Sequence, residues 1–199
     1  MTTVQTSALV ILTVFYASFF LKMLGLKRRG IDSNLLGKGE KPAAARRVER
    51  WLKAVTYGGA TVQFLSVFLD GRLPGPAMPG VLRGLGLLLA AGGTTMFIAA
   101  MAAMKSNWRS GHDLGQNTSL VVGGPYEFSR NPAFVGFDLL YVGLALALPN
   151  LVNLASAALA VMVFHRQILQ EEFFLQSAFG DDYQRYQARV NRYLGRRAR

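Results

Sequence analysis

The chain has 199 residues, of which 51% are hydrophobic and 17% are charged, and its formal net charge is +11. This length suits one domain and is too short for two of ordinary size. The sequence contains no cysteine, which excludes disulfides, thiolate catalysis and cysteine-ligated metals.

Apolar residues occur in long blocks. Residues 1–21, 84–104 and 139–164 contain no charged side chain, and about 20 mostly apolar residues form a helix that crosses a bilayer. A soluble domain of this size has no room to bury so many long apolar helices. The sequence therefore predicts an all-α integral membrane protein.

The first three predicted transmembrane helices span residues 4–26, 51–70 and 81–104. The first could instead be a cleaved signal peptide. Residues 1–7 lack a basic stretch and residues 22–25 are a poor cleavage site, so a retained helix is expected. The second is shorter, with Trp51 and Lys53 at its edge, where both residue types favour the membrane interface.

The last apolar stretch is divided by Pro149-Asn150, because proline interrupts a helix interior. The predicted segments are residues 132–148 and 151–170, a helical hairpin that brings the expected number of transmembrane helices to about five. Aromatic residues continue at helical spacing beyond residue 170, with a break at Gly180. Residues 181–199 are expected to form an amphipathic helix on the cytoplasmic membrane surface.

Basic residues lie mostly in alternate connections, which hold 19 of the 22. The first group is Lys27, Arg28, Arg29, Lys38, Lys41, Arg46, Arg47, Arg50 and Lys53, the second is Lys105, Arg109 and Arg130, and the third is Arg166, Arg185, Arg189, Arg192, Arg196, Arg197 and Arg199. The positive-inside rule places the N-terminus outside and the C-terminus in the cytoplasm, with a bacterial-type inner membrane as the expected location. Attraction to anionic lipid explains the basic excess, so no nucleic-acid partner is predicted.

The first chemically suggestive stretch precedes the fourth helix. Gly123-Gly124-Pro125 predicts a turn, and Pro132 suits the first position of a helix. The helix N-terminus, with Arg130 beside it, favours a carboxylate or a phosphate, and Tyr126 and Phe128 add aromatic surface. The alternative is an interfacial loop with belt aromatics and an anchoring arginine.

The second stretch follows the fifth helix. Glu171 and Glu172 are adjacent carboxylates near the hydrocarbon, which predicts a cationic partner. The alternative is a helix-end ion pair with Arg166 or Arg185. Within the fourth helix, Asp138 is either a functional group or a structural one satisfied by a neighbour.

Metal and nucleotide motifs are not found. His112 and His165 are isolated in the sequence and no H-E-x-x-H occurs, so no metal site is expected. P-loop, Rossmann and nucleophile-elbow patterns are also absent from the sequence.

Together these stretches resemble the isoprenylcysteine carboxyl methyltransferase and phospholipid methyltransferase family of membrane enzymes. The resemblance covers roughly residues 105–194 and is carried by Thr118-Ser119-Leu120-Val121, Gly124-Pro125-Tyr126, Ser129 to Gly136, Glu171-Glu172-x-x-Leu175, Phe179 to Tyr183 with Tyr186, and Val190. The chain would then divide into residues 1–104, with three helices and a basic loop, and residues 105–199, the cofactor-binding half, within one structural domain.

The resemblance implies S-adenosylmethionine as cofactor and a lipophilic or lipidated acceptor. By position, the cofactor site would be formed by Leu120, Val121, Gly124, Tyr126, Arg130, Asn131, Pro132, Ala133 and Glu171. Arg130 would meet the cofactor carboxylate and Glu171 its ammonium. Arg130, Glu172 and Asp138 are the candidate catalytic residues, the two carboxylates as proton acceptors.

Two positions depart from the eukaryotic relatives. Asn131 replaces a histidine before the proline, and an amide cannot act as a general base. Gln167 replaces a basic residue, which leaves the neighbouring Arg166 as the candidate substrate anchor. The alternatives to a carboxyl methyltransferase-like enzyme are a phospholipid N-methyltransferase, a sterol-reductase-like enzyme that uses NADPH, and a non-enzymatic membrane scaffold.

Overall fold

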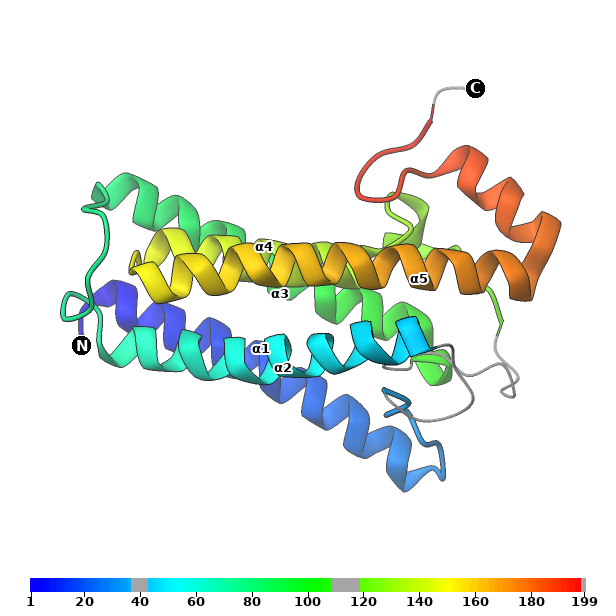
Figure 1. Cartoon of the computed structure of the whole chain (residues 1–199), viewed down its shortest axis with the longest axis horizontal. Coiled ribbons are helices and arrows are strands. Elements are labelled where there is room, and N and C mark those ends of the chain that lie inside the picture. The colour runs from blue at the N-terminus through cyan, green and yellow to red at the C-terminus, as the bar shows by residue number, and fades with distance from the viewer. Residues whose placement is uncertain (37–42, 109–118, 198–199) are drawn as a thin grey trace.

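The computed structural model describes residues 1–36, 43–108 and 119–197. Within them lie five α-helices and two short 3-10 helices, in the order α1 (Thr3–Arg28), α2 (Ala43–Phe68), α3 (Gly80–Met104), η1 (Lys105–Asn107), η2 (Gly124–Glu127), α4 (Pro132–Ala147) and α5 (Leu151–Arg189). The helices form an elongated bundle (Figure 1). The all-α prediction is confirmed.

In the described part of the chain, three helical segments are long and apolar enough to cross a membrane, namely Thr3–Arg28, Gly80–Asn107 and Leu151–Arg189. A fourth apolar helix, Pro132–Ala147, is shorter. The molecule therefore has the composition of an integral membrane protein. Five crossings, and their orientation, stay predictions.

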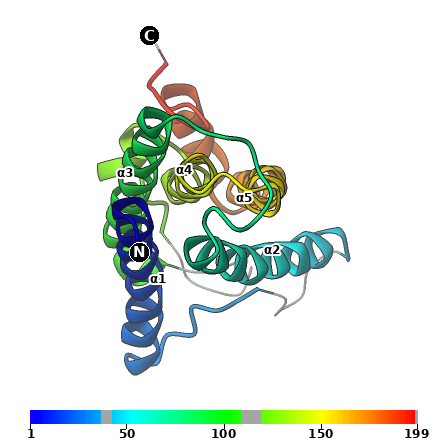
Figure 2. The ribbon, with the colours of Figure 1, turned by 90° about the vertical axis from the view of Figure 1, so that its left-hand side faces the viewer.

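The helix α4 occupies the centre of the bundle. Viewed from one end, α4 lies between α3 and α5, and α1 and α2 lie below this row of three helices (Figure 2). One apolar cluster joins α4 to α1 and α3, where the Phe15 and Phe97 rings stack with centroids 4.4 Å apart. A second joins α4 to α2 and α5 through Tyr141 and Phe164.

Glycine pairs bring α3 and α4 into their close contact. A Cβ on Gly93 would lie 2.6 Å from the carbonyl oxygen of Gly136, and one on Gly86 would lie 2.5 Å from that of Gly143. Gly86 and Gly93 are seven residues apart on α3, and Gly136 and Gly143 are seven residues apart on α4. Seven residues make about two helical turns, so the two glycines of each helix lie on one face and the two faces meet along one seam. Small residues of this kind let helix backbones approach in lipid.

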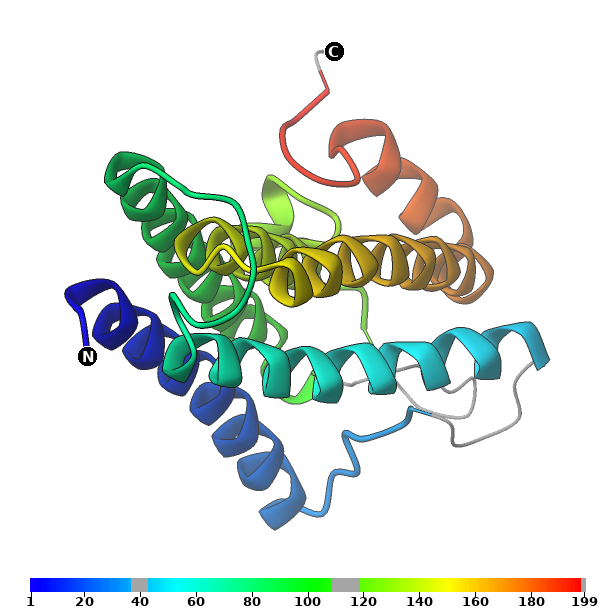
Figure 3. The ribbon, with the colours of Figure 1, turned by 60° about the vertical axis from the view of Figure 1, so that its left-hand side comes forward.

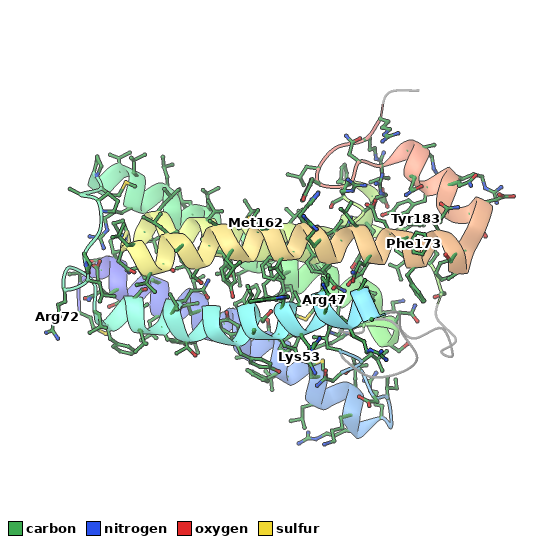
Figure 4. The ribbon with its side chains drawn as sticks, viewed as in Figure 1. Arg47, Lys53, Arg72, Met162, Phe173 and Tyr183 are labelled. Atoms are coloured by element: carbon green, nitrogen blue, oxygen red, sulfur yellow. The ribbon has the colours of Figure 1, made fainter. Side chains whose placement is uncertain are left out.

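The α4–α5 turn forms as predicted. Proline at position 149 prevents continuation of α4, and Asn150 caps α5 by accepting a 2.9 Å hydrogen bond from the Asn153 N–H. At this end of the bundle Arg83 pairs with Asp70 at 2.5 Å and donates a 2.7 Å hydrogen bond from Nε to the Ala147 carbonyl. Arg72 also lies at this end, whereas Arg47 lies toward the other end of the bundle, on α2 (Figure 4).

Three predicted boundaries are wrong. The fifth helix does not end near residue 170, because α5 continues to Arg189 with a kink at Gly180. The helix α2 begins at Ala43, eight residues before the predicted start. The prediction missed this first part because its residues are largely charged, and the start was assigned from the run of apolar residues alone. The predicted amphipathic helix over residues 181–199 ends at Arg189, and the chain beyond it folds back with a β-bridge between Val190 and Arg196. The predicted break at Gly180 is confirmed by its φ of +49° within α5.

Candidate cofactor and acceptor site

A cavity of about 750 Å³ lies among α1, α2, α4, α5 and the segments that join α3 to α4. Its volume is in the range of small-molecule binding sites. The cavity has a polar end, where both sequence motifs meet, and an apolar end between α1 and α2.

The polar end brings together seven of the residues predicted for the cofactor. These cavity-lining residues are Leu120, Val121, Tyr126, Arg130, Asn131, Ala133 and Glu171. They come from the segment before η2, from η2 itself, from the start of α4 and from α5, so the fold joins motifs separated by some 40 positions. Burial raises the pKa of the Tyr126 hydroxyl, which stays a neutral phenol beside this end of the cavity.

The start of α4 is set by its sequence. Pro132 occupies the first helical position and Asn131 the N-cap position, as predicted. The Asn131 side chain does not cap the helix. Instead its amide nitrogen donates to Glu172 Oε1 at 3.1 Å and to the Arg192 carbonyl at 3.2 Å.

Arg130 is buried and is held on two sides. Its Nε and one Nη donate to Glu172 Oε1 at 3.1 and 2.8 Å, and the other Nη donates to the Val190 carbonyl at 2.8 Å. A guanidinium has five N–H donors, so these bonds leave N–H groups for a ligand in the cavity that Arg130 lines.

Glu172 lies outside the cavity lining and accepts five hydrogen bonds. Oε1 accepts three from Arg130 and Asn131, and Oε2 accepts two from Arg192 at 3.1 and 2.9 Å. The bond to Glu172 raises the pKa of Arg192 further above its ordinary value, so the arginine stays charged. A carboxylate so engaged is a poor proton acceptor, which differs from the role predicted for Glu172.

Glu171 lines the cavity on the neighbouring face of α5. Gln167, one turn earlier, is fully buried and donates from Nε2 to Glu171 Oε1 at 3.1 Å. The residue that replaces a basic side chain of the eukaryotic relatives therefore holds the glutamate in place.

Among the described residues, five of the predicted set do not line the cavity, namely Gly124, Pro132, Asp138, Arg166 and Glu172. Arg166 is exposed on α5, so the structure does not bring the predicted substrate anchor to the cavity. Asp138 lies on α4, and one of its carboxylate oxygens is buried with no hydrogen-bond partner among the residues that the structure describes. His112 and Thr118 lie outside the described residues.

The apolar end of the cavity was not predicted. It is lined by aromatic side chains of four helices, namely Phe15, Tyr16, Phe19, Phe20, Tyr57, Phe64, Phe134, Phe137 and Phe164. Phe20 and Tyr57 line the cavity and are also exposed, so the cavity opens between α1 and α2. These two helices diverge toward this region (Figure 3). In the sequence, these aromatics resemble ordinary lipid-facing residues, and no local pattern separates them.

Comparison with known proteins agrees with these motifs. A model of the phospholipid methyltransferase family matches residues 81–182. The protein-S-isoprenylcysteine O-methyltransferase of Homo sapiens is 31% identical over 138 residues, which are 65% of this chain and 49% of that protein. The enzyme of the same name from Schizosaccharomyces pombe is 38% identical over 72 residues, 36% of this chain and 30% of that protein.

A probable protein-S-isoprenylcysteine O-methyltransferase of Oryza sativa subsp. indica is 33% identical over 73 residues, which cover 36% of this chain and 38% of that protein. The matches thus span less than half of the length of these relatives. The family match covers just over half of this chain and includes the start of α4 and the Glu171-Glu172 pair. The chain belongs to the phospholipid methyltransferase family.

Proposed function

We propose that this protein is an S-adenosylmethionine-dependent methyltransferase that acts on a lipophilic acceptor at the cytoplasmic face of the membrane. The observation that carries the proposal is that one cavity has both Arg130 and Glu171 at its polar end and an apolar end that opens between α1 and α2. In such a space a polar donor and an apolar acceptor can lie next to each other, each in contact with side chains of matching polarity.

The polar end fits the amino-acid part of the donor. That part carries a carboxylate and an ammonium, and Arg130 and Glu171 are a cation and an anion that both line the cavity. Charge-assisted hydrogen bonds from such groups are the strong ones. Tyr126 and Phe179 add aromatic surface at this end, which suits an adenine ring or a sulfonium.

S-adenosylmethionine supplies a methyl group on a sulfonium, and its transfer is an in-line displacement. The residues of this chain would mainly align the two partners and exclude water. Of the three candidate catalytic residues, Arg130 alone lines the cavity, and it would act by binding the donor.

The acceptor would enter sideways from the bilayer. The exposed Phe20 and Tyr57 mark the opening, and the wall behind them is largely aromatic. A long or bulky apolar group would fill this part of the cavity by burial of apolar surface. The basic ends of the helices favour the cytoplasm for the polar end, where S-adenosylmethionine is available.

A nicotinamide-dependent enzyme is disfavoured by the charges. In the described lining, two side chains are basic, Lys53 and Arg130, whereas a dinucleotide phosphate favours a larger basic set. The deciding experiment is calorimetric titration of the purified protein with S-adenosylhomocysteine and, separately, with NADPH. We expect binding of the first alone. Binding of NADPH alone, or of neither, would contradict the proposal.

A second assay addresses the acceptor. The protein in lipid vesicles is incubated with S-adenosylmethionine labelled in its methyl group and with either a prenylcysteine carboxylate or a phosphatidylethanolamine. Label in the organic phase identifies the acceptor class. Donor binding without transfer to any lipophilic compound would contradict the enzymatic part of the proposal.

A further inference from the structure

The C-terminal segment, residues 190–197, packs against the residues that precede α4. The Arg130 N–H donates to the Asn191 carbonyl at 3.0 Å, and the Gly195 N–H donates to the Phe128 carbonyl at 2.7 Å. Arg196 pairs with Glu127 at 2.6 Å, and its guanidinium lies 4.9 Å from the centre of the Phe128 ring. In Figure 1 this segment returns from the end of α5 to η2.

The same segment reaches the guanidinium of Arg130 in two ways. The Val190 carbonyl accepts from one Nη at 2.8 Å, so the backbone of the segment holds one side of the group directly. Arg192 acts from the other side, through Glu172. Its Nε and Nη2 occupy Glu172 Oε2, while Arg130 occupies Oε1.

The two oxygens of Glu172 thus bind different arginines. This matters because Arg130 also lines the cavity. A free carboxylate takes an arginine with both oxygens in a bidentate pair. Arg192 engages Oε2, so Arg130 donates both Nε and Nη2 to Oε1 alone. A bidentate pair would use the same two N–H groups but would turn the guanidinium toward both oxygens, so Arg192 affects the orientation of the group. Without Arg192, both oxygens of the buried Glu172 would compete for the guanidinium of Arg130 and draw it from the cavity.

We propose that residues 190–197 set the orientation of Arg130 in the donor site, and that Arg192 is a positioning residue that acts through Glu172. None of the segment lines the cavity in the described structure. Its effect is therefore on the donor, and the acceptor end is untouched. The effect on binding rests on the proposed function, whereas the hold on residues 126–131 does not.

The test compares Arg192→Gln, Arg192→Lys and a control, Arg189→Gln. Arg189 is exposed at the end of α5 and its side chain bonds to the Arg185 carbonyl of its own helix, so the control removes the same charge three residues away. Loss of a charge-assisted pair lowers affinity by roughly 10-fold or more. We expect this loss in S-adenosylhomocysteine affinity for Arg192→Gln, an intermediate value for Arg192→Lys, and no change for Arg189→Gln.

In steady-state assays, Arg192→Gln should raise the donor KM and leave the acceptor KM unchanged. A purely structural role would instead lower the melting temperature or the active fraction and leave the affinity of the folded protein as it was. Unchanged donor affinity in folded Arg192→Gln, or an equal loss in Arg189→Gln, would overturn the proposal.

Hydrogen exchange provides a readout without ligand. In Arg192→Gln, amides of residues 126–131 and of Gly195 should exchange faster than in the wild type and in Arg189→Gln. If the wild type binds no S-adenosylhomocysteine, the proposed function fails. Hydrogen exchange alone then tests whether residues 190–197 hold residues 126–131 in place. Faster exchange supports that hold, and unchanged exchange overturns it.

Discussion

Glu171 and Glu172 are neighbours in the sequence, and the structure gives their carboxylates different surroundings. Glu172 is buried among two arginines and an asparagine, whereas Glu171 faces the cavity and accepts a hydrogen bond from Gln167. The sequence predicts a cationic partner for the pair, but it cannot assign one. The partners of Glu172 lie 42, 41 and 20 positions away, and no local pattern marks Arg192 among the basic residues of the tail.

Glu171→Gln should weaken donor binding more than it alters folding. Losing one charge-assisted hydrogen bond at a partly buried position costs about 1.5–3 kcal/mol, or roughly 10- to 150-fold in affinity. The measurement is calorimetry with S-adenosylhomocysteine. Asp182→Asn is the matched control, because Asp182 pairs with Arg185 on the surface of α5 and does not line the cavity. Unchanged binding in folded Glu171→Gln would remove Glu171 from the donor site.

Arg130→Lys should discriminate between two forms of the donor product. Lysine keeps the charge but loses the planar fork, so the affinity for S-adenosylhomocysteine should fall while that for its decarboxylated analogue changes little. The ratio of the two affinities is measured on the same variant, which removes any effect of partial unfolding. Arg130→Ala is less informative, because it leaves the buried Glu172 without one of its partners, a loss that typically costs about 3–5 kcal/mol of stability.

The helical elements show where sequence patterns succeed and where they fail. The start of α4 at Pro132 and the break at Gly180 are encoded by the residues themselves, through the fixed φ of proline and the positive φ open to glycine. The course of residues 190–197 depends on backbone bonds to Phe128 and Arg130, some 60 positions earlier in the connection between η2 and α4. Helical spacing of the aromatics therefore predicted a helix that these distant contacts override.

The glycine seam between α3 and α4 gives a prediction for these two elements. Gly93→Ala would place a methyl group 2.6 Å from the Gly136 carbonyl oxygen, and overpacking of this kind typically costs about 1–3 kcal/mol. Thermal unfolding in detergent should show a lower melting temperature. Gly92→Ala is the control, because a Cβ there meets nothing within 4 Å. Equal melting temperatures of the two variants would mean that the helices are not in contact at this seam.

For the whole molecule, the charge distribution predicts the orientation in the membrane. Single cysteines can be introduced without background labelling, because the chain contains none. Ala44 at the start of α2 and Ala77 before α3 are both exposed. The positive-inside rule predicts that Ala77→Cys reacts with a membrane-impermeant maleimide on intact cells and that Ala44→Cys reacts after permeabilisation. The reverse pattern would overturn the orientation and the cytoplasmic donor site with it.

The short central helix has a consequence for the membrane itself. With 16 residues at about 1.5 Å each, α4 is roughly 24 Å long, whereas the hydrocarbon core of a bilayer is about 30 Å thick. If α4 crosses the bilayer, its start at the polar end of the cavity lies below the level of the headgroups, or the lipid around it is thinned. Hydrophobic mismatch of this kind costs fractions of a kcal/mol per Å. Vesicles of shorter acyl chains should thus favour the active arrangement, and thick bilayers should restrain it.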